Sequence, residues 1–532
     1  PPIYICRLCH ESDIFASIFV SEPIGKLYNK TMLKAEKKRR KFTMKKKAVS
    51  ALLCAAMVAG MLAGCGKGSD SGTPSDTSKG DASNATESAS SNLKDDGKVL
   101  NIYCWNEEFK SRITAHYPDY KEVDATHGKI GDVDVVWNIT PSDDNAYQNN
   151  LDAALLNQQD APADDKIDIF LVEADNALKY VDTDYTAPVK DLGITDADLS
   201  KQYQYTKDIV TDSKGVLKGV SWQGCPGVLF YNREAAKDVL GTDDPDEVGK
   251  LFSSYSTILD TAKKLKDKGY RIFSSDAELS YFSGDSAWVV DGKLNVDQAR
   301  YDYMDLCVDL YKNDYTAYAT QWSTPWYQAM AGEVPILSAD IQSGADDSVN
   351  VWDSTQFEEA TKDAQKTSVF AFGLPAWGVL TMRDHVGDTS GKWGVCAGPT
   401  YGFGGGTYIG ISSNSKRQDT AWDFVKFCTL NEDTSDWWID YSQGDTVSYL
   451  PALEKHKDDE NEIYGGEKLY QFWLEQAKGI DYSKVTRYDK QIGDAWSQAI
   501  SAIKTGEKSK EDAVNAFYDT VQSTFPEIEI DR

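Results

Sequence analysis

Histidine is scarce in this chain, and cysteine is too sparse to build a scaffold. Five histidines occur among 532 residues, and the four that follow residue 65 show no spacing typical of metal ligands. Five cysteines follow Cys65, at positions 104, 225, 307, 396 and 428. They are odd in number and widely spaced, so the sequence excludes a disulfide scaffold, and whether any of them pair stays open. We expect no metal and no cofactor.

Long hydrophobic runs are also missing, with one exception near the start. Residues 48–61 are apolar over about 14 positions, which is the length of a signal-peptide core and short for a membrane span. Three lysines precede the run, and Leu62, Ala63 and Gly64 lead from it to Cys65. This order resembles the lipobox of bacterial lipoproteins. We therefore expect residues 44–64 to be a signal peptide and Cys65 to carry the lipid anchor at the outer face of the membrane.

Residues 1–43 do not fit this start. A Cys-x-x-Cys-His pattern from Cys6 to His10 matches a haem-attachment motif, but a haem site upstream of a signal peptide would be removed with it. Arg39, Arg40 and Lys41 can be encoded by a purine run that resembles a ribosome-binding site before Met44. We hypothesise that residues 1–43 are an over-extended reading frame and not native protein.

Basic residues are fewer than acidic residues in this chain. The chain has 56 Lys and Arg against 84 Asp and Glu, a formal net charge of −28. Because 12 of the basic and 4 of the acidic residues precede Cys65, the chain after it carries roughly −36. This balance argues against nucleic acid and polyanionic substrates.

The residues after Cys65 divide into a polar stretch and a long folded part. Residues 65–98 are mostly Ser, Asp, Gly, Thr and Asn, which predicts a disordered tether. The remaining chain of roughly 430 residues exceeds one hydrophobic core, so two lobes are expected. Strand patterns at 99–105, 132–137 and 167–172 alternate with helical periodicity, which favours α/β lobes with mainly parallel sheets.

Aromatic residues are plentiful, with 14 Trp and 29 Tyr. Several Trp fall where a strand is predicted to end, and strand ends face clefts in α/β sheets. Carboxylates and amides accompany them, as in Trp105-Asn106-Glu107-Glu108 and Trp222-Gln223. Sugars offer apolar C–H faces that stack on indole rings and hydroxyl groups that need acceptors. The mixture points to a carbohydrate site, although core packing is the alternative for any single Trp.

Three other functions fit the sequence less well than sugar capture does. Residues 402–406 are rich in glycine, but they lack the lysine and the strand-to-helix context of a phosphate loop. A carboxylate pair such as Glu107 and Glu108 could serve a glycoside hydrolase. No Ser-His-Asp or Cys-His signature is visible. A peptide receptor would need a charged clamp, and basic residues near the expected cleft are few.

The order of these segments resembles the extracellular solute-binding proteins of family 1, the maltose-binding-protein-like receptors of carbohydrate ABC importers. The segments that carry the resemblance are the lipobox and residues 99–106, 168–175, 219–227, 393–399, 404–407, 409–416 and 421–425. The resemblance implies a periplasmic-binding-protein-like α/β fold whose two lobes are joined by a multi-strand hinge. It places an N-lobe at 99–223 and 373–428 and a C-lobe at 224–372 and 429–532.

The same resemblance implies the site and its partners. The chain would be a non-enzymatic receptor that captures an oligosaccharide and delivers it to the membrane subunits of an ABC permease, as a lipid-anchored monomer. The alternative is a cell-surface glycoside hydrolase or carbohydrate-binding module. Crossings between the lobes would lie near 222–231, near 372–377 and after the helix at 419–430. The implied sugar contacts are Trp105, Glu108, Glu173, Asp175, Trp222, Gln223, Trp326, Trp377 and Phe403.

Overall fold

The computed structural model describes residue 95 and residues 97–284, 286–482 and 485–532, which belong to one compact unit. The predicted signal peptide, the lipid anchor at Cys65 and nearly all of the predicted tether lie outside these residues, as does the hypothesis on residues 1–43. Among the described helices, none is both long and apolar enough to cross a membrane.

The first lobe is built on a seven-stranded sheet with the strand order β2-β3-β4-β1-β5-β14-β6. The central strands β4, β1 and β5 run parallel, and the other neighbours are antiparallel. The strand bounds are β1 Val99–Cys104, β2 Tyr120–Asp124, β3 His127–Ile130, β4 Val133–Ile139, β5 Ile169–Glu173, β6 Val220–Ser221 and β14 Thr407–Ile411.

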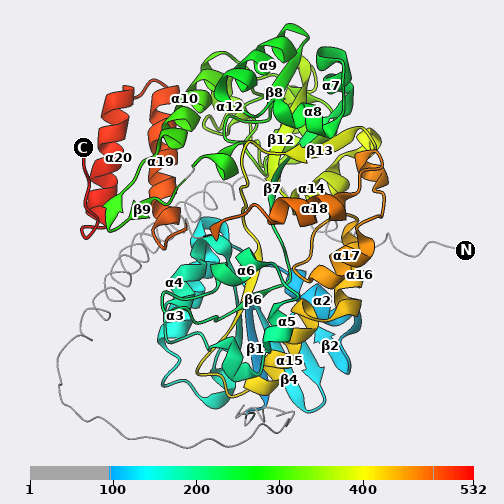
Figure 1. Cartoon of the computed structure of the whole chain (residues 1–532), viewed down its shortest axis with the longest axis vertical. Coiled ribbons are helices and arrows are strands. Elements are labelled where there is room, and N and C mark those ends of the chain that lie inside the picture. Colours follow the sequence, from blue (N-terminus) through cyan, green and yellow to red (C-terminus); the bar gives the residue numbers. More distant parts are fainter. Residues whose placement is uncertain (1–94, 96, 285, 483–484) are drawn as a thin grey trace, which may run out of the picture. The chain divides into compact units, whose positions relative to one another are not determined.

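Helices cover both faces of this sheet because its central strand is apolar on both sides. In β5, Ile169 and Leu171 pack with one core, and Phe170 and Val172 pack with another. The strand period of two sends alternate side chains to opposite faces. Figure 1 shows α3 and α4 beside one face and α2 and α15 beside the other. The helix bounds are α2 Glu108–His116, α3 Ala146–Leu156, α4 Ala177–Val181, α5 Asp196–Leu199, α6 Gln204–Ile209, α15 Gln418–Thr429 and α16 Glu432–Ser442.

The second lobe is built on a five-stranded sheet with the order β11-β12-β7-β13, in which β8 also pairs with β12. Only β8 and β12 run parallel within it. Its strands are β7 Gly227–Asn232, β8 Tyr270–Phe273, β11 Val334–Pro335, β12 Lys366–Pro375 and β13 Trp393–Ala397. Helices pack on both faces: α7 Arg233–Leu240, α8 Pro245–Lys250, α9 Tyr255–Asp267, α10 Gln298–Lys312, α11 Thr324–Met330 and α14 Gly378–His385.

The C-terminal segments complete the second lobe and the region between the sheets. Helices α19 Asp489–Lys504 and α20 Lys510–Thr524 form a separate core with α10 and the β9–β10 hairpin, Val289–Val290 and Lys293–Leu294. The remaining elements are α12 Ala339–Gln342, α13 Ser354–Thr361, α17 Leu450–His456, α18 Leu469–Ala477, η1 Asp143–Asn145, η2 Ala163–Asp165, η3 Ala174–Asn176, η4 Val189–Leu192, η5 Ser280–Phe282, η6 Gly387–Thr389 and η7 Glu462–Tyr464.

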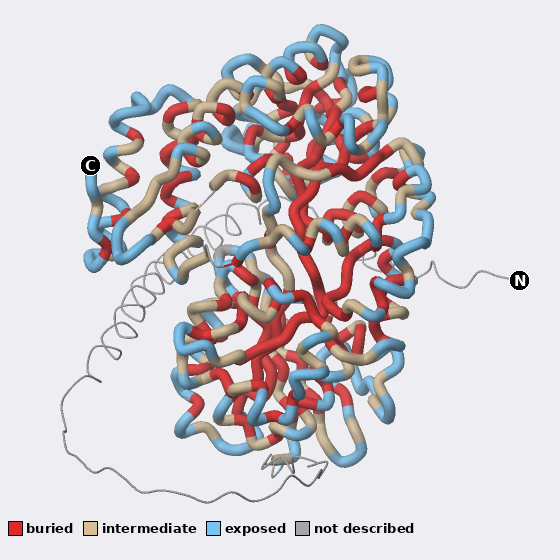
Figure 2. The backbone as a smooth tube through the Cα atoms, in the orientation of Figure 1, coloured by how far each residue is buried: buried red, intermediate tan, exposed pale blue. Residues whose placement is uncertain are grey.

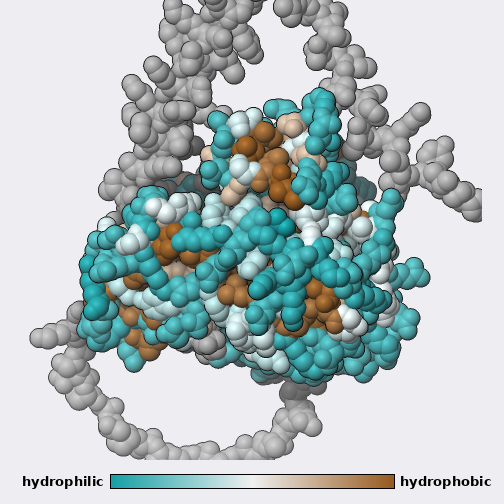
Figure 3. All heavy atoms as spheres, turned by 90° about the horizontal axis from the view of Figure 1, so that it is seen from above, coloured by the Kyte–Doolittle hydropathy of each residue, from teal (hydrophilic) through white to brown (hydrophobic). Residues whose placement is uncertain are grey.

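Buried residues run along the inner strands of both sheets, whereas the edge strand β2 of the first sheet is mostly exposed (Figure 2). The face seen in Figure 3 is largely hydrophilic and carries separate hydrophobic patches, in keeping with the acidic composition.

The strand pairing departs from the boundaries expected from the sequence. Residues 373–428 are expected in the N-lobe, but β12 continues to Pro375 beside β7, and β13 also pairs with β7. The reason is that β12 is one uninterrupted strand of 10 residues. The chain therefore returns to the first sheet through residues 398–406. Likewise α16, expected in the C-lobe, packs against α2 and α15 of the first lobe. Both sheets are mixed rather than mainly parallel.

Among the described residues, five carboxyl groups have strongly raised pKa values because their surroundings disfavour the charged form. Burial raises the pKa of each above the ordinary value of 3.8 for Asp or 4.5 for Glu. The raised pKa values are about 6 for Asp168 and Asp489 and about 7 for Glu278, Asp445 and Glu467. The folded protein therefore binds more protons than the unfolded chain at mildly acidic pH, and its stability falls as pH rises through this range.

We expect the melting temperature to be higher at pH 5.5 than at pH 8, by a few degrees. Differential scanning calorimetry at constant ionic strength measures this directly. The Gly373 N–H donates to the Glu278 carboxylate over 2.8 Å, and Glu278→Gln keeps an oxygen that can accept this bond. Because the substitution removes one titrating group, the difference in melting temperature between the two pH values should shrink. An equal or higher melting temperature at pH 8 in the unsubstituted protein would contradict the prediction.

Candidate functional site

The site lies where several backbone segments pass between the two sheets. Residues 222–226 leave the first sheet, and the backbone of residues 402–404 runs beside them. The Gly227 N–H donates to the Gly402 carbonyl over 2.8 Å, and the Gly404 N–H donates to the Cys225 carbonyl over 3.2 Å. A further segment joins from the C-terminal side, where the Ser448 N–H donates to the Trp222 carbonyl over 2.8 Å. These crossings hold the two lobes together.

A cavity of about 640 Å³ opens beside the crossings, a size typical of small-molecule sites. Both lobes, the crossing at 405–407 and helix α16 contribute to its walls. The lining residues include Trp105, Asn106, Glu108, Glu173, Asp175, Gln223, Tyr281, Gln321, Trp322, Trp377, Leu380, Thr381, Arg383, Asp384, Trp438 and Tyr441.

The glycines of the crossing are needed for close approach. Gly405 and Gly406 have φ angles of 66° and 95°. A Cβ on Gly406 would lie 3.2 Å from the Cys225 Sγ, so a side chain there would collide with the neighbouring crossing as well as strain the backbone.

One wall of the cavity carries a stacked pair of indoles. The rings of Trp322 and Trp377 lie 5.4 Å apart with an interplanar angle of 21°, and the buried Trp326 supports Trp322 from 5.1 Å. The Trp377 Nε1 donates to the Gly404 carbonyl over 3.3 Å, which ties this pair to the crossing. Trp322 remains 49% exposed. Its indole therefore offers a flat apolar face beside the cavity.

The backbone at Trp322 is strained. Its φ is +71°, in the left-handed region that a bulky residue rarely adopts, at a cost of about 1–2 kcal/mol. The buried Ser323 helps to hold this turn, since its Oγ donates to the Thr320 carbonyl over 2.6 Å. Such strain in proteins clusters at ligand clamps.

A second aromatic pair comes from α16. Trp438 and Tyr441 have ring centroids 5.4 Å apart, and Tyr441 also stacks on Trp437 at 5.6 Å. Tyr441 is 56% exposed. The Arg383 Nη1 donates to the Tyr441 carbonyl over 2.6 Å, and the Arg383 Nε pairs with Asp384 over 2.7 Å. The cavity therefore has aromatic faces on two separate segments of the chain.

Carboxylates and amides line the space between these aromatic pairs. Glu108 accepts a hydrogen bond from the Gln223 Nε2 over 3.2 Å, and Gln223 Oε1 accepts from the Thr407 N–H over the same distance. Glu108 also forms an ion pair of 3.3 Å with Arg112. These contacts fix the orientation of Glu108 and Gln223.

Glu173 and Asp175 are different, because within the described part of the chain neither carboxylate has a hydrogen-bond or ion-pair partner. Enclosure by the protein raises the pKa of Glu173, and the charge of Asp175 adds to this. Enclosure also raises the pKa of Asp175, although Lys490 opposes it. Lys490 itself pairs with Asp494 at 2.6 Å. The two carboxylates are thus open acceptors that face the cavity.

The structure brings together six of the nine residues that the sequence points to. Trp105, Glu108, Glu173, Asp175, Gln223 and Trp377 line the cavity. The other three lie outside its lining. Trp222 is 2% exposed and stacks on Phe109 at 5.5 Å with an angle of 11°. Trp326 is fully buried, and Phe403 packs against Tyr205 and Tyr482.

Sequence reasoning missed Trp322, Trp438, Tyr441 and Tyr281. The sequence carries two clusters of tryptophan, at Trp322–Trp326 and Trp437–Trp438, which the structure places at the start of α11 and within α16. They did not show which ring of each cluster faces the cavity, because this depends on where α11 begins and on how α16 packs.

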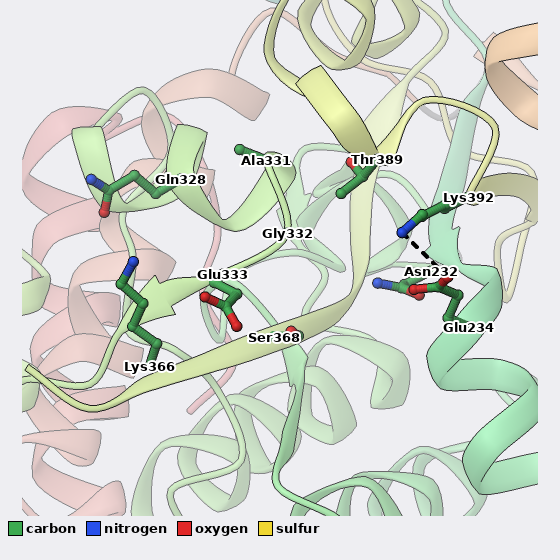
Figure 4. Close-up of a pocket in the computed structure, with 10 residues that line it drawn as sticks. All are labelled: Asn232, Glu234, Gln328, Ala331, Gly332, Glu333, Lys366, Ser368, Thr389 and Lys392. Carbon is green, nitrogen blue, oxygen red and sulfur yellow. Dashed lines mark ion pairs between the residues drawn. The ribbon is translucent and has the colours of Figure 1, made fainter.

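Another cavity, of about 540 Å³, lies at the far end of the second sheet (Figure 4). It sits where β7 ends at Asn232, whereas β7 begins at the crossing with Gly227. Its lining is polar, with Lys366, Glu333 and an ion pair of 3.3 Å between Lys392 and Glu234. It has no aromatic face and is separate from the site between the lobes.

The sequence matches a family of known proteins over most of the folded part. Residues 122–463 match the profile of the bacterial extracellular solute-binding proteins. The match spans more than half of the chain, which therefore belongs to this family. No curated protein matches the chain in sequence.

Solved structures confirm the fold. One is an extracellular solute-binding protein of family 1, with 16% identity, a TM-score of 0.60 and coverage of 80% of this chain and 100% of that chain. Another is the galacto-N-biose-/lacto-N-biose I-binding protein of the ABC transporter from Bifidobacterium longum, with 14% identity, a TM-score of 0.57 and coverage of 82% and 100%. The sugar-binding protein MalE of Xanthomonas citri has 13% identity, a TM-score of 0.56 and coverage of 80% and 97%. The predicted two-lobed, periplasmic-binding-protein-like fold is thus confirmed.

Replacement of Trp322 by two different small residues separates its ring from its strained backbone. Trp322→Ala and Trp322→Gly should weaken binding of the expected oligosaccharide alike, about tenfold, because both lose the indole. Trp322→Gly should nevertheless be the more stable of the two by about 1 kcal/mol, since glycine accepts the positive φ. Calorimetric titration and urea unfolding measure the two effects. Unequal affinities, or greater stability of the alanine variant, would count against this interpretation.

Proposed function

We propose that this protein is the ligand-capturing component of a carbohydrate ABC importer and that it binds a neutral oligosaccharide in the cavity between its lobes. The observation that carries the proposal is the presence of two aromatic pairs, Trp322 with Trp377 and Trp438 with Tyr441, on separate walls of one cavity. The exposed ring is Trp322 in the first pair, at 49%, and Tyr441 in the second, at 56%, whereas Trp438 is 4% exposed. Two such rings suit a ligand with more than one sugar ring.

The polar groups between the aromatic pairs support the same ligand class. Sugar hydroxyls donate hydrogen bonds, and the open carboxylates of Glu173 and Asp175 can accept them. Gln223 and Glu108 add a fixed amide and a fixed carboxylate. The same carboxylates would repel a uronic acid or a sulfated sugar, which is why the proposal specifies a neutral ligand.

The family supports capture rather than catalysis. Its members are named for solute binding outside the cell, and the similar Bifidobacterium longum protein was solved in complex with lacto-N-biose. A ligand that touches both lobes stabilises the closed arrangement and shifts the population toward it. The membrane subunits of the importer would then recognise the closed form.

A panel of neutral and acidic oligosaccharides tests the ligand class. We expect one or more neutral oligosaccharides to raise the melting temperature, since a ligand at 100 times its Kd adds about 2.7 kcal/mol of stability. Matched uronic-acid oligosaccharides should give no shift, and Trp377→Ala should lose the shift seen with the neutral ligand. Chromatography of the same mixtures checks for turnover. Turnover would favour the glycoside hydrolase alternative, and a shift with acidic sugars alone would contradict the proposed class.

We also propose that the exported chain is anchored through Cys65 at the outer face of the cell membrane. The sequence from Lys45 to Cys65 supports this anchor, and the polar residues 65–98 would act as a linker between the membrane and the folded part. In a bacterial host the protein should fractionate with membranes, and mass spectrometry should find an acylated cysteine at its N-terminus. Cys65→Ser should abolish the acylation and release the protein from the membrane fraction. An unmodified Cys65 in the membrane-bound protein would contradict the anchor.

A further inference from the structure

Arg112 is a buried cation held between two tryptophan rings. The residue lies on α2 and is 1% exposed. Its guanidinium carbon lies 4.2 Å from the Trp222 ring centroid and 3.7 Å from that of Trp438. Indole faces attract cations, and the attraction is strongest where water is excluded. A planar guanidinium can stack on both rings at once, which an ammonium cannot do.

The polar contacts of Arg112 all lead to Glu108, one helical turn earlier. The Arg112 Nη1 donates to the Glu108 carbonyl over 3.0 Å, and the Nη2 lies 3.3 Å from the Glu108 Oε1. Glu108 is the carboxylate that lines the cavity and accepts from Gln223. A buried charge is costly without a partner, so Arg112 and Glu108 depend on each other.

The second tryptophan of the stack also faces the cavity. Trp438 belongs to α16 and lines the site together with Tyr441. Its Nε1 donates to the Asp445 Oδ2 over 3.0 Å, so the ring is held by a hydrogen bond at its edge and by Arg112 at its face. Burial raises the pKa of Asp445 to about 7, so the Arg112–Glu108 pair carries the charge of this cluster at mildly acidic pH.

Arg112 itself does not line the cavity, yet it touches residues from three segments that meet there. These segments are α2, the crossing that begins at Trp222, and α16. We infer that Arg112 is a positioning residue, which fixes the Glu108 carboxylate and the Trp438 ring in the orientation in which they meet the ligand. This inference rests on the proposed function, because it assigns roles within the same site.

A double-mutant cycle distinguishes positioning from general support of the fold. Arg112→Lys keeps the charge but loses the planar stack and should lower sugar affinity about tenfold. In the Glu108→Gln background the same change should lower it clearly less, because only the contact of Arg112 with the Trp438 ring then remains. An equal loss in both backgrounds, or no loss in either, would overturn the inference.

Lys110 provides a matched control on the same helix. It is also a buried cation and pairs with Glu122 at 2.7 Å, away from the cavity. Lys110→Met should lower stability and leave sugar affinity unchanged. If Arg112→Lys does not fold, Trp222→Phe takes its place in the cycle. It weakens the stack from one side and should lower affinity only when Glu108 is present, and additive losses would again overturn the inference.

A ligand-free measurement keeps this test separate from the proposed function. Hydrogen exchange of residues 105–112 and 432–442 should speed up in Arg112→Lys, whereas Lys110→Met should leave the exchange of residues 432–442 unchanged. If the unsubstituted protein binds no sugar of the panel, the proposed function fails, and exchange alone decides the positioning role. Unchanged exchange in Arg112→Lys would then overturn it, and faster exchange confined to these two segments would support it.

Discussion

The site depends on the hydrogen bonds of one side chain, Gln223, where the chain leaves the first sheet. Its Nε2 donates to Glu108 in the cavity, and its Oε1 accepts from the Thr407 N–H on the crossing that returns. The Ser221 hydroxyl extends this network by donating to the Thr407 carbonyl over 2.7 Å. Because Gln223 is almost fully buried, loss of any partner would leave a polar atom without water. The same hydrogen bonds therefore shape the cavity wall and connect the two lobes.

The crossings between the lobes differ in how their backbone is held. The crossing at residues 222–226 has its backbone paired on both sides, to 402–404 and to 446–448. Gly405 and Gly406, whose φ angles are positive, lie in the returning crossing, where it enters β14. The returning crossing therefore contains the backbone that most needs glycine, whereas the crossing at 222–226 is held by hydrogen bonds on both sides.

The sequence predicts the fold and part of the site for a physical reason. The residues that follow β1 and β5 must lie at one edge of a sheet with parallel central strands, so Trp105, Glu173 and Asp175 reach the cavity. The sequence does not show which of Trp222 and Gln223 faces the cavity. Successive residues of an extended segment point to opposite faces, so only one of the two can do so. Packing selects Gln223 for the cavity and puts Trp222 in the core beside Phe109. Likewise Trp438 depends on contacts between α16 and α2, residues far apart in the sequence.

Three basic residues near the cavity each form an ion pair with a carboxylate. Arg112 pairs with Glu108, Arg383 pairs with Asp384, and Lys490 pairs with Asp494. Each of these three cations therefore already has a carboxylate partner and is not available to pair with a negatively charged ligand. Glu173 and Asp175 are left as acceptors without a donor. A ligand that supplies hydroxyl donors would complete these hydrogen bonds, whereas an anionic ligand would add a negative charge where Asp175 already raises the pKa of Glu173. The preference for an uncharged ligand in the proposed function rests on these two carboxylates, which are a small part of the acidic excess visible in the sequence.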